Sequence, residues 1–516
     1  MDERPQINPW IIAVTVMLST FLEVLDTSVV NVSLPHIAGS LSATVDEATW
    51  VLTSYLVANA IVLPITGWLA NQFGRKRLLI AAVTGFTLAS LLCGIAPTLP
   101  MLVLFRVLQG ASGGALQPIS QAVLLETFPP QERGKAMAFW GVGIVVAPIL
   151  GPTLGGWLTS TYSWRWVFYI NLPIGIASII MTRLFIFDPH YIRPRGGKVD
   201  FWGLGMLALG VAALQIMLDK GQEDDWFGSH FIVVLAIVAA VALVAFVIWE
   251  LRVKDPIVHL SVFKDRTYAT GVFLMTLLGF VLYGALVLLP IFLQTLLNYT
   301  AVSAGVWTSP RGIGALIFMP ITGLLLSRRW DARILLIIGL LTGAYSLYLF
   351  SGFTLATGPW NIFWPQILQG MGMAFIFVPL TTVTMDPVPN REMGNATSLF
   401  NLMRNLGAGA GISAVTTMVA RRAQVHQQRL VEQLNPANPQ LRQTLAGMQA
   451  MLMAKGANAS LAAQRALALL YGTVQQQSAL LSFVEAFFVL SLIFVAMAPM
   501  VLIMRRPRSG KTVAAH

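Results

Sequence analysis

The sequence has little charge and almost no cysteine. Only 11% of its 516 residues are Asp, Glu, Lys or Arg, while 56% are hydrophobic. Soluble domains carry about 25% charged residues, so this composition excludes an ordinary soluble protein. The one cysteine, Cys93, lies in an apolar segment, which excludes disulfides and Cys-based metal sites. The sequence also contains no His-Glu-x-x-His pattern and no complete phosphate-binding loop, so it does not predict an enzyme.

The sequence consists largely of long apolar segments separated by short loops. A stretch of about 20 apolar residues spans a bilayer as a helix. The first segment contains Glu23 and Asp26 and continues to Pro35, so we interpret it as a retained anchor helix and not a cleaved signal peptide. The pattern predicts an all-α membrane protein with fourteen spans, at about residues 10–33, 48–70, 78–96, 100–122, 134–158, 164–187, 201–218, 230–251, 270–293, 302–326, 333–352, 361–385, 397–420 and 480–504.

Basic residues are concentrated in alternate loops. One set of loops contains Arg75, Arg133 and Arg328, among others, whereas the short loops of the other set carry acids such as Asp219 and Glu223. Cytoplasmic loops of membrane proteins hold the excess of Lys and Arg, so we expect both termini in the cytoplasm. The net charge of +11 therefore reflects membrane topology and does not predict nucleic-acid binding.

An internal repeat divides the chain. The segment 64–67 (Pro-Ile-Thr-Gly) returns at 320–323, and 108–110 (Leu-Gln-Gly) returns at 368–370, with offsets of 256 and 260 residues. Equivalent segments keep the same direction, as in transporters whose two six-helix halves surround a substrate site near the membrane midplane. We therefore predict a first half at 1–187, two inserted helices with flanking loops at 188–268, and a second half at 269–516 that includes a periplasmic loop at 421–479.

Few charges are embedded in the predicted spans. An ionisable group inside a membrane helix is expensive, by roughly 2.5–3.5 kcal/mol on insertion scales, and usually has a function. We interpret Asp26 as a proton carrier and Glu23 as a second titrating or cation-recognising group; the alternative for Asp26 is a fixed ion pair or a helix–helix hydrogen bond. Arg106 cannot shed its proton and needs a partner, so we place it near the coupling site. Gln366 replaces it in the repeat.

Small residues recur in the fifth span at four-residue intervals. Such a row makes a smooth face on which another helix packs closely. The predicted packing motif comprises Gly143, Ala147, Gly151 and Gly155, with Pro148, Pro152 and Gly156 interleaved.

A glycine-rich basic loop joins the second and third spans. It is either an anchor on the cytoplasmic side or a gate that opens and closes that side of the protein. Its key residues are Gly67, Asn71, Gly74, Arg75 and Lys76.

These motifs together resemble the EmrB/QacA group of fourteen-span drug:proton antiporters in the major facilitator superfamily, and EmrB-type pumps most of all. Segments 25–35, 67–77, 106–114, 143–156 and 164–175 carry the resemblance. It implies the major facilitator fold and export of hydrophobic drugs driven by the proton-motive force, without a cofactor. It also implies protonation at Asp26 and coupling through Arg106. One departure is Asn71, where the group usually has Asp, so a charged latch cannot form there.

A substrate pocket is predicted from polar, Met and aromatic residues on inward faces, because such walls adapt to varied apolar ligands. Packing or lipid contact is the alternative for each residue. The candidates are Asn31, Gln117, Trp140, Tyr283, Gln366, Gln369, Phe377, Asn401 and Asn405.

The polar segment 421–479 has leucines at roughly helical spacing, which suggests helices outside the membrane. The resemblance implies an inner-membrane pump that works with an EmrA-like periplasmic adaptor and a TolC-like outer-membrane channel, so we expect this segment to dock the adaptor. A solvated helical cap is the alternative. For the function, the alternative to multidrug efflux is a dedicated proton-coupled exporter of one metabolite or siderophore.

Overall fold

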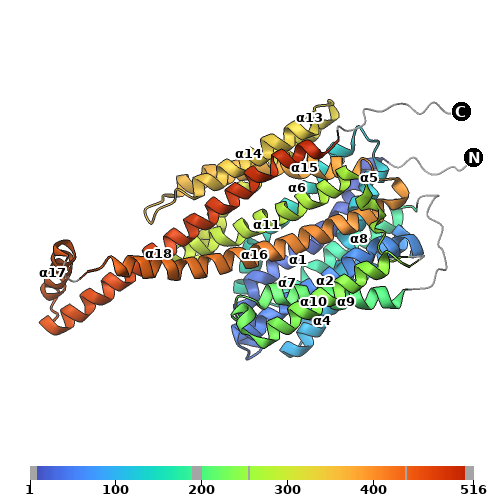
Figure 1. Cartoon of the computed structure of the whole chain (residues 1–516). Helices are drawn as coiled ribbons and strands as arrows, with labels where there is room; N and C mark the ends of the chain where they lie inside the picture. Colours follow the sequence, from blue (N-terminus) through green and yellow to red (C-terminus); the bar gives the residue numbers. More distant parts are fainter. Residues whose placement is uncertain (1–7, 189–199, 254–255, 436–437, 506–516) are drawn as a thin grey trace, which may run out of the picture.

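A computed structural model describes residues 8–188, 200–253, 256–435 and 438–505. Their regular structure is entirely helical, and most helices run side by side in one long bundle (Figure 1). The loops with Arg75, Arg133 and Arg328 lie at one end, which we call the basic end. At the opposite, projecting end, a slender helical extension leaves the bundle.

The helices follow the predicted order. The first half contains α1 (Pro9–Ser40), α2 (Val45–Phe73), α3 (Arg75–Ile95), α4 (Leu99–Gly113), α5 (Leu116–Thr127), α6 (Arg133–Thr161), α7 (Trp166–Tyr169) and α8 (Asn171–Phe185). The inserted pair is α9 (Phe201–Lys220) and α10 (His230–Glu250). The second half contains α11 (Arg266–Thr295), α12 (Ala301–Thr308), α13 (Pro310–Ser327), α14 (Ala332–Phe350), α15 (Pro359–Met385), α16 (Met393–Glu432), α17 (Pro439–Ala454) and α18 (Ala459–Met497). It thus begins at Arg266, slightly before the predicted boundary at 269.

Thirteen segments of the described residues are long and apolar enough to cross a membrane, compared with the fourteen predicted. The predicted span at 397–420 is the one that fails this criterion. It lies in α16, which packs against α2, α11 and α18 inside the bundle. Its polar residues, such as Asn401 and Arg404, are buried against other helices, so α16 does not need an apolar surface all round.

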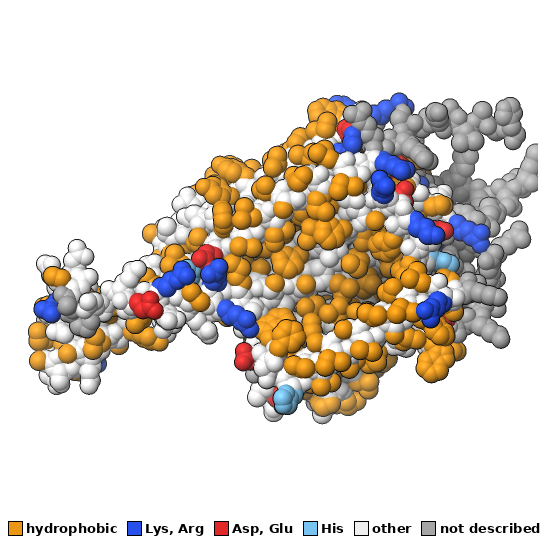
Figure 2. Space-filling model, in the orientation of Figure 1, with side chains coloured by type: hydrophobic (Ala, Val, Ile, Leu, Met, Phe, Trp, Pro, Cys, Tyr) orange, Lys and Arg blue, Asp and Glu red, His pale blue; other side chains and the backbone are white. Residues whose placement is uncertain are grey.

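The surface shows the same division. Figure 2 shows apolar side chains covering the body of the visible face, while Lys, Arg, Asp and Glu gather toward its two ends and along the extension. A broad apolar band of this kind is what a membrane protein presents to lipid.

The repeat is visible in the packing. A Cβ added to Gly110 on α4 would lie 2.3 Å from the Tyr55 carbonyl oxygen on α2. At the corresponding positions of the second half, a Cβ on Gly370 of α15 would lie 2.0 Å from the Arg311 carbonyl oxygen of α13. The same glycine therefore permits the same close helix crossing in both halves.

The inserted helices lie against one side of the bundle. Lys220 at the end of α9 donates from Nζ to Thr49 Oγ1 of α2 at 2.7 Å. Trp226, in the following turn, donates from Nε1 to Thr417 Oγ1 of α16 at 2.9 Å. The pair is thus attached to α2 of the first half and to α16 of the second.

The polar segment 421–479 is largely a continuation of two bundle helices. α16 and α18 run on beyond the bundle, and α17 packs against α18 at the tip (Figure 1). At the base of this projection, Glu485 forms an ion pair with Arg422, with 3.2 Å between Oε2 and Nε, and its Oε1 lies 3.0 Å from His426 Nε2. Glu485 of α18 thus has two basic neighbours on α16.

Candidate functional site

Asp26 lies on α1 and is fully buried. Its Oδ2 accepts a hydrogen bond from Arg106 Nη1 at 2.6 Å. Its Oδ1 accepts from Gln109 Nε2 at 2.9 Å and from Asn171 Nδ2 at 2.7 Å. Donors on α4 and α8 thus surround the Asp26 carboxyl group with charge-assisted and neutral hydrogen bonds.

Arg106 is also fully buried and is held by more than the ion pair. Its Nε donates to the Val51 carbonyl at 3.0 Å, and its Nη1 also donates to Gln109 Oε1 at 2.7 Å. The guanidinium lies over the Tyr55 ring, 4.2 Å from its centroid. In so dry a site the two charges attract strongly, and removing either would leave the other uncompensated. All contacts of Asp26 in this conformation lie within the first half.

Gln109, Asn171 and Ser90 complete this network, although the sequence interpretation did not assign them. Asn171 Nδ2 also donates to Ser90 Oγ at 3.0 Å, which ties α8 to α3. Gln109 follows Arg106 by three residues, so it shares that helix face, and Asn171 lies in a motif that carries the family resemblance. The sequence therefore contained evidence that could have assigned Gln109 and Asn171 to the site, but none for Ser90.

Glu23, one turn from Asp26, has a different environment. Its Oε1 accepts from Asn59 Nδ2 at 2.9 Å, while its buried Oε2 has no hydrogen-bond partner among the described residues. Gln117 and Arg404 are the further groups that interact with it. Because Arg404 belongs to α16, Glu23 faces the interface between the halves.

Arg404 connects the halves and was also not assigned from the sequence. Its Nη2 donates to Gln117 Oε1 of α5 and, at 3.3 Å, to Asn405 Oδ1. Its Nε is buried and has no hydrogen-bond partner among the described residues. A buried cation therefore meets the half-paired Glu23 across the interface.

Several predicted pocket residues meet at this interface. Trp140 of α6 stacks on Phe377 of α15, with ring centroids 6.0 Å apart. Asn401 Nδ2 of α16 donates to Gln121 Oε1 of α5 at 2.6 Å. These contacts, together with those of Gln117, close the interface at this level in the present conformation.

The other pocket candidates lie apart. Gln366 and Gln369 are buried on α15, and Tyr283 on α11 is close enough to interact with Arg311. Asn31 is exposed near the projecting end of α1 and joins none of these groups. The polar character of Asn31 alone could not distinguish an exposed position from one in the interface.

The small-residue face of α6 lies against α1. A Cβ on Gly143 would come within 2.8 Å of Met17 Cγ, one on Gly151 within 2.2 Å of Ser28 Oγ, and one on Gly155 within 2.8 Å of the Val29 carbonyl oxygen. Ala147 is fully buried. Gly156 differs from the prediction, because nothing lies within 4 Å of its Cβ position, so it takes no part in this packing.

The loop between α2 and α3 is tightly held. Gly74 has φ +88°, a backbone conformation that favours glycine. Directly after it, the Lys76 backbone N–H donates to Asp188 Oδ1 at 2.9 Å, and Lys76 Nζ donates to the Arg183 carbonyl at 2.7 Å. Arg75 forms a buried ion pair with Glu126 of α5.

Asn71 and Gly67 lie on the α2 side of this loop. The Asn71 side chain forms no hydrogen bond within the described part of the chain. The charged groups that fasten the loop are instead Lys76 and Asp188, together with the Arg75–Glu126 ion pair. Gly67 marks close contact with the other half, since a Cβ there would lie 2.5 Å from Asn395 Cα of α16.

Two six-helix halves in parallel repeat, with a buried ion pair next to their interface, are the architecture of a membrane transporter. Residues 16–412 match the Major Facilitator Superfamily. The chain therefore belongs to this superfamily of transporters and is a multi-pass membrane protein.

Its similarity to particular proteins extends over most of its length. It is 41% identical to the fatty acid resistance protein FarB of Neisseria gonorrhoeae over 491 residues, which cover 95% of each chain. It is 43% identical to the multidrug export protein EmrB of Haemophilus influenzae and 41% identical to that of Escherichia coli K12, each covering 83% of this chain and 84% of the relative.

Solved structures share the fold. The human organic anion transporter MFSD10 superposes with a TM-score of 0.63 at 14% identity, covering 96% of this chain and 100% of the other. A double-tryptophan mutant of XylE gives a TM-score of 0.64 at 15% identity, covering 97% of each. At these identities the structures establish the fold alone.

Proposed function

We propose that this protein is a proton-coupled multidrug exporter of hydrophobic compounds in a bacterial inner membrane, with both termini in the cytoplasm. The similarity to EmrB proteins over 83% of the chain supports the export of drugs. The basic loops, gathered at one end, support the orientation. The proton-motive force supplies the energy, and no cofactor is needed.

The observation that carries the proposal is the buried Asp26–Arg106 pair. Three hydrogen bonds join Asp26 to α4 and α8 in this conformation. A proton arriving on Asp26 removes its negative charge, so the attraction to Arg106 is lost and the hydrogen bonds that join α1 to α4 and α8 have to change. Moving one proton charge through 100 mV is worth about 2.3 kcal/mol, enough for more than tenfold accumulation of substrate.

Glu23 and Arg404 link this event to the substrate. Glu23 lies on the same face of α1 as Asp26, and Arg404 lies across the interface on α16. A change at α1 therefore alters the contacts between Glu23, Gln117 and Arg404. Substrate that enters the interface breaks those contacts and so acts on α1. It therefore competes with proton binding at Asp26, because Glu23 and Asp26 lie on the same helix.

The projecting helices support an assembly with other proteins. In the proposed orientation, the extension formed by α16, α17 and α18 reaches into the periplasm. There it provides a docking element for an EmrA-like adaptor, which connects in turn to a TolC-like outer-membrane channel.

A dedicated exporter is the second candidate. It is favoured by the similarity to FarB, a fatty acid resistance protein, which extends over 95% of both chains. A substrate panel separates the two: resistance to chemically unrelated drugs supports multidrug efflux, whereas resistance confined to one chemical class supports the dedicated exporter.

The direct test is proton release from the purified protein in weakly buffered detergent when a lipophilic cation is added. We expect release from the wild type and none from Asp26→Asn. Asp219→Asn is the control, because Asp219 is another acid on a membrane helix and accepts a hydrogen bond from Thr53 away from this site. Undiminished release from Asp26→Asn, or no release from wild-type protein that binds the cation, would contradict the proposal.

A further inference from the structure

The two halves meet along two seams that the repeat relates to each other. In the first, Gly67 of α2 lies against Asn395 of α16, as described above. In the second, a Cβ on Gly323 of α13 would lie 3.0 Å from Ala138 Cβ of α6. Gly67 and Gly323 are equivalent residues of the repeat, so the seams would be alike if the two halves stood alone.

The inserted helices make the seams different. α9 and the turn after it attach to both α2 and α16, through Lys220 and Trp226, and lie against the first seam. Within the described residues, the inserted helices pack on α2 and α16 and not on α6 and α13. Along the second seam, Leu316 and Leu324 of α13 are 42% and 50% exposed. In the described part of the chain, the second seam is therefore the one that the inserted helices leave open to the lipid.

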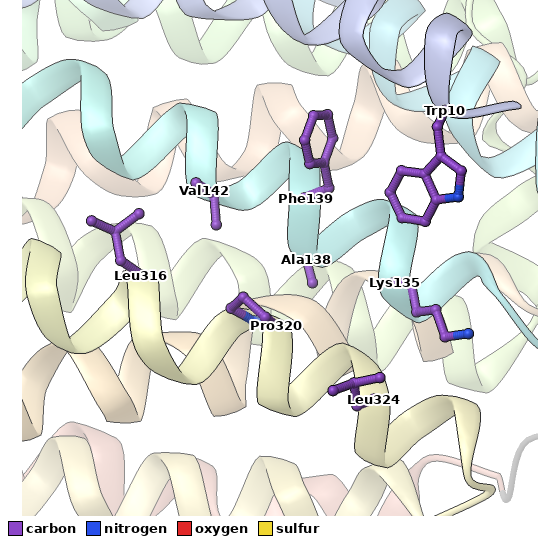
Figure 3. Close-up of a pocket in the computed structure, with 8 residues that line it drawn as sticks. All are labelled: Trp10, Lys135, Ala138, Phe139, Val142, Leu316, Pro320 and Leu324. Atoms are coloured by element: carbon purple, nitrogen blue, oxygen red, sulfur yellow. The ribbon is translucent and has the colours of Figure 1, made fainter.

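A groove of about 480 Å³ lies in the open seam (Figure 3), within the usual range of roughly 300–1,000 Å³ for small-molecule sites. On each helix a row of residues at four-residue spacing lines the groove. The rows are Ala138 and Val142 on α6 and Leu316, Pro320 and Leu324 on α13, and the lining is completed by Trp10, Lys135 and Phe139.

The groove is charged at one end and apolar along the rest of its length. Lys135, at its basic end, is the one charged residue in the lining, and its Nζ lies 3.6 Å from Glu132 Oε1 in an ion pair that is partly exposed to solvent. Trp10 stands beside it, in edge contact with Phe128 and Phe139. The remainder of the lining is apolar. A cation and an indole at the membrane surface, followed by an apolar trough, match an anionic head group followed by a hydrocarbon chain.

The groove also leads inward. Behind Ala138 and Val142, a Cβ on Gly141 would lie 3.1 Å from Met319 Sδ and 3.5 Å from the Phe377 ring. Phe377 is stacked on Trp140, which belongs to the interface described above. A small separation of α6 from α13 would therefore connect the lipid-facing groove to the interface between the halves.

We propose that this groove is where a free long-chain fatty acid in the leaflet at the basic end enters the protein. The inference rests on the proposed export function and names an anionic substrate class for it. The carboxylate pairs with Lys135 and the chain lies between the two rows. Lys135 is the one charged residue in the lining, so it can pair with the single carboxylate of a fatty acid, and it repels lipophilic cations.

The test is photolabelling of the full-length protein in nanodiscs with palmitic acid that carries a diazirine near the chain end, followed by peptide mapping. We expect labels on residues 138–142 and 316–324, and competition by unlabelled palmitate. A photoactivatable lipophilic cation should not label this groove. Labelling only at other places would overturn the inference, as would equal competition by phosphatidylglycerol, which would indicate a resident phospholipid.

Paired variants sharpen the test. Leu316→Trp fills the groove and should reduce the groove labelling at least fivefold, whereas Ile317→Trp, at the next and 51% exposed position outside the lining, should not. Lys135→Gln should reduce labelling by about two- to fivefold, as expected for a partly exposed ion pair. Glu132→Gln, which removes the competing carboxylate and keeps the cation, should not reduce it. Equal losses within either pair would overturn the inference.

Proton release on addition of a lipophilic cation is measured in the same nanodiscs. Release without groove labelling would overturn the fatty-acid site and leave the proposed function standing. Groove labelling without proton release would instead contradict proton-coupled export, and with it the inference that the bound fatty acid is a substrate.

Discussion

Tyr55 and Arg106 in the first half correspond in the repeat to Arg311 and Gln366 in the second. Both sets surround the same helix crossing, at Gly110 in one half and at Gly370 in the other. In the first half a carboxylate and a guanidinium neutralise each other. In the second, the guanidinium sits on a different helix and interacts with a phenol. The repeat has preserved the packing and changed the chemistry, so the packing does not require the ion pair.

This comparison assigns different tasks to the halves. The buried ion pair of the first half contains a carboxyl group, which can bind a proton, whereas the corresponding residues Arg311 and Gln366 of the second half offer none. The first half is therefore suited to carry the proton. The second contributes cations, Arg404 at the interface and Arg311 nearer the projecting end.

The largest expected effect comes from replacing Arg106 by glutamine, the residue that the second half has at the corresponding position, Gln366. Arg106→Gln leaves Asp26 buried without its cation, so we expect a loss of about 3–5 kcal/mol in the free energy of unfolding. Denaturation of the purified protein in detergent measures it. The double variant Asp26→Asn/Arg106→Gln should recover most of the stability and none of the proton release. A single variant as stable as the wild type would show that the pair is not buried as described.

The next largest loss of stability is expected at the close helix crossing that both halves share. Gly110→Ala and Gly370→Ala each push a methyl group into a backbone carbonyl of the neighbouring helix, so each should lose about 1–3 kcal/mol of stability. Gly156→Ala, which has open space around it, serves as the matched control and should be neutral or slightly stabilising. Thermal unfolding of the three variants checks this, and a strong loss in only one of the first two would mean that the crossings are not equivalent.

The smallest effect is expected at the cation of the second half. Arg311 has no carboxylate partner among the described residues, so Arg311→Gln leaves no opposite charge uncompensated. We expect a stability change below about 1 kcal/mol and proton release that still depends on Asp26. The same release assay decides it, and release that disappears in this variant would show that the second half also takes part in proton coupling.

The positions of the membrane helices could be predicted because continuous apolar stretches report contact with lipid. The predicted span at 397–420 lies in α16, which is more polar than the other spans because Asn401 and Arg404 are buried against neighbouring helices. Polarity after residue 420 correctly marked the end of the apolar segment but did not mark the end of the helix. Helix ends are set locally, for example by the Asn438 and Asn458 side chains that cap α17 and α18.

The candidate site was predictable only in its charges. Asp26 and Arg106 have opposite sign and few alternative partners in the membrane, so their proximity could be inferred. Neutral polar residues are numerous along the helices, and each can bond to its own backbone, to a neighbour or to water. Hence Asn171 and Ser90 were missed, and Asn31 was placed in a pocket that it does not join. Which face of a helix meets which neighbour depends on crossings that the sequence does not encode locally.

The continuity of α16 gives the molecule a mechanical property. Forty residues of unbroken helix span about 60 Å, from Met393 near the basic end past Arg404 to Glu432 in the projection. Such a rod acts as a lever: a tilt of about 10° near its inner end would swing the outer end through roughly 10 Å. A small rearrangement beside Arg404 is thereby magnified at a distance, and anything seated on the tip would sense the state of the transport cycle through leverage instead of through a bound ligand.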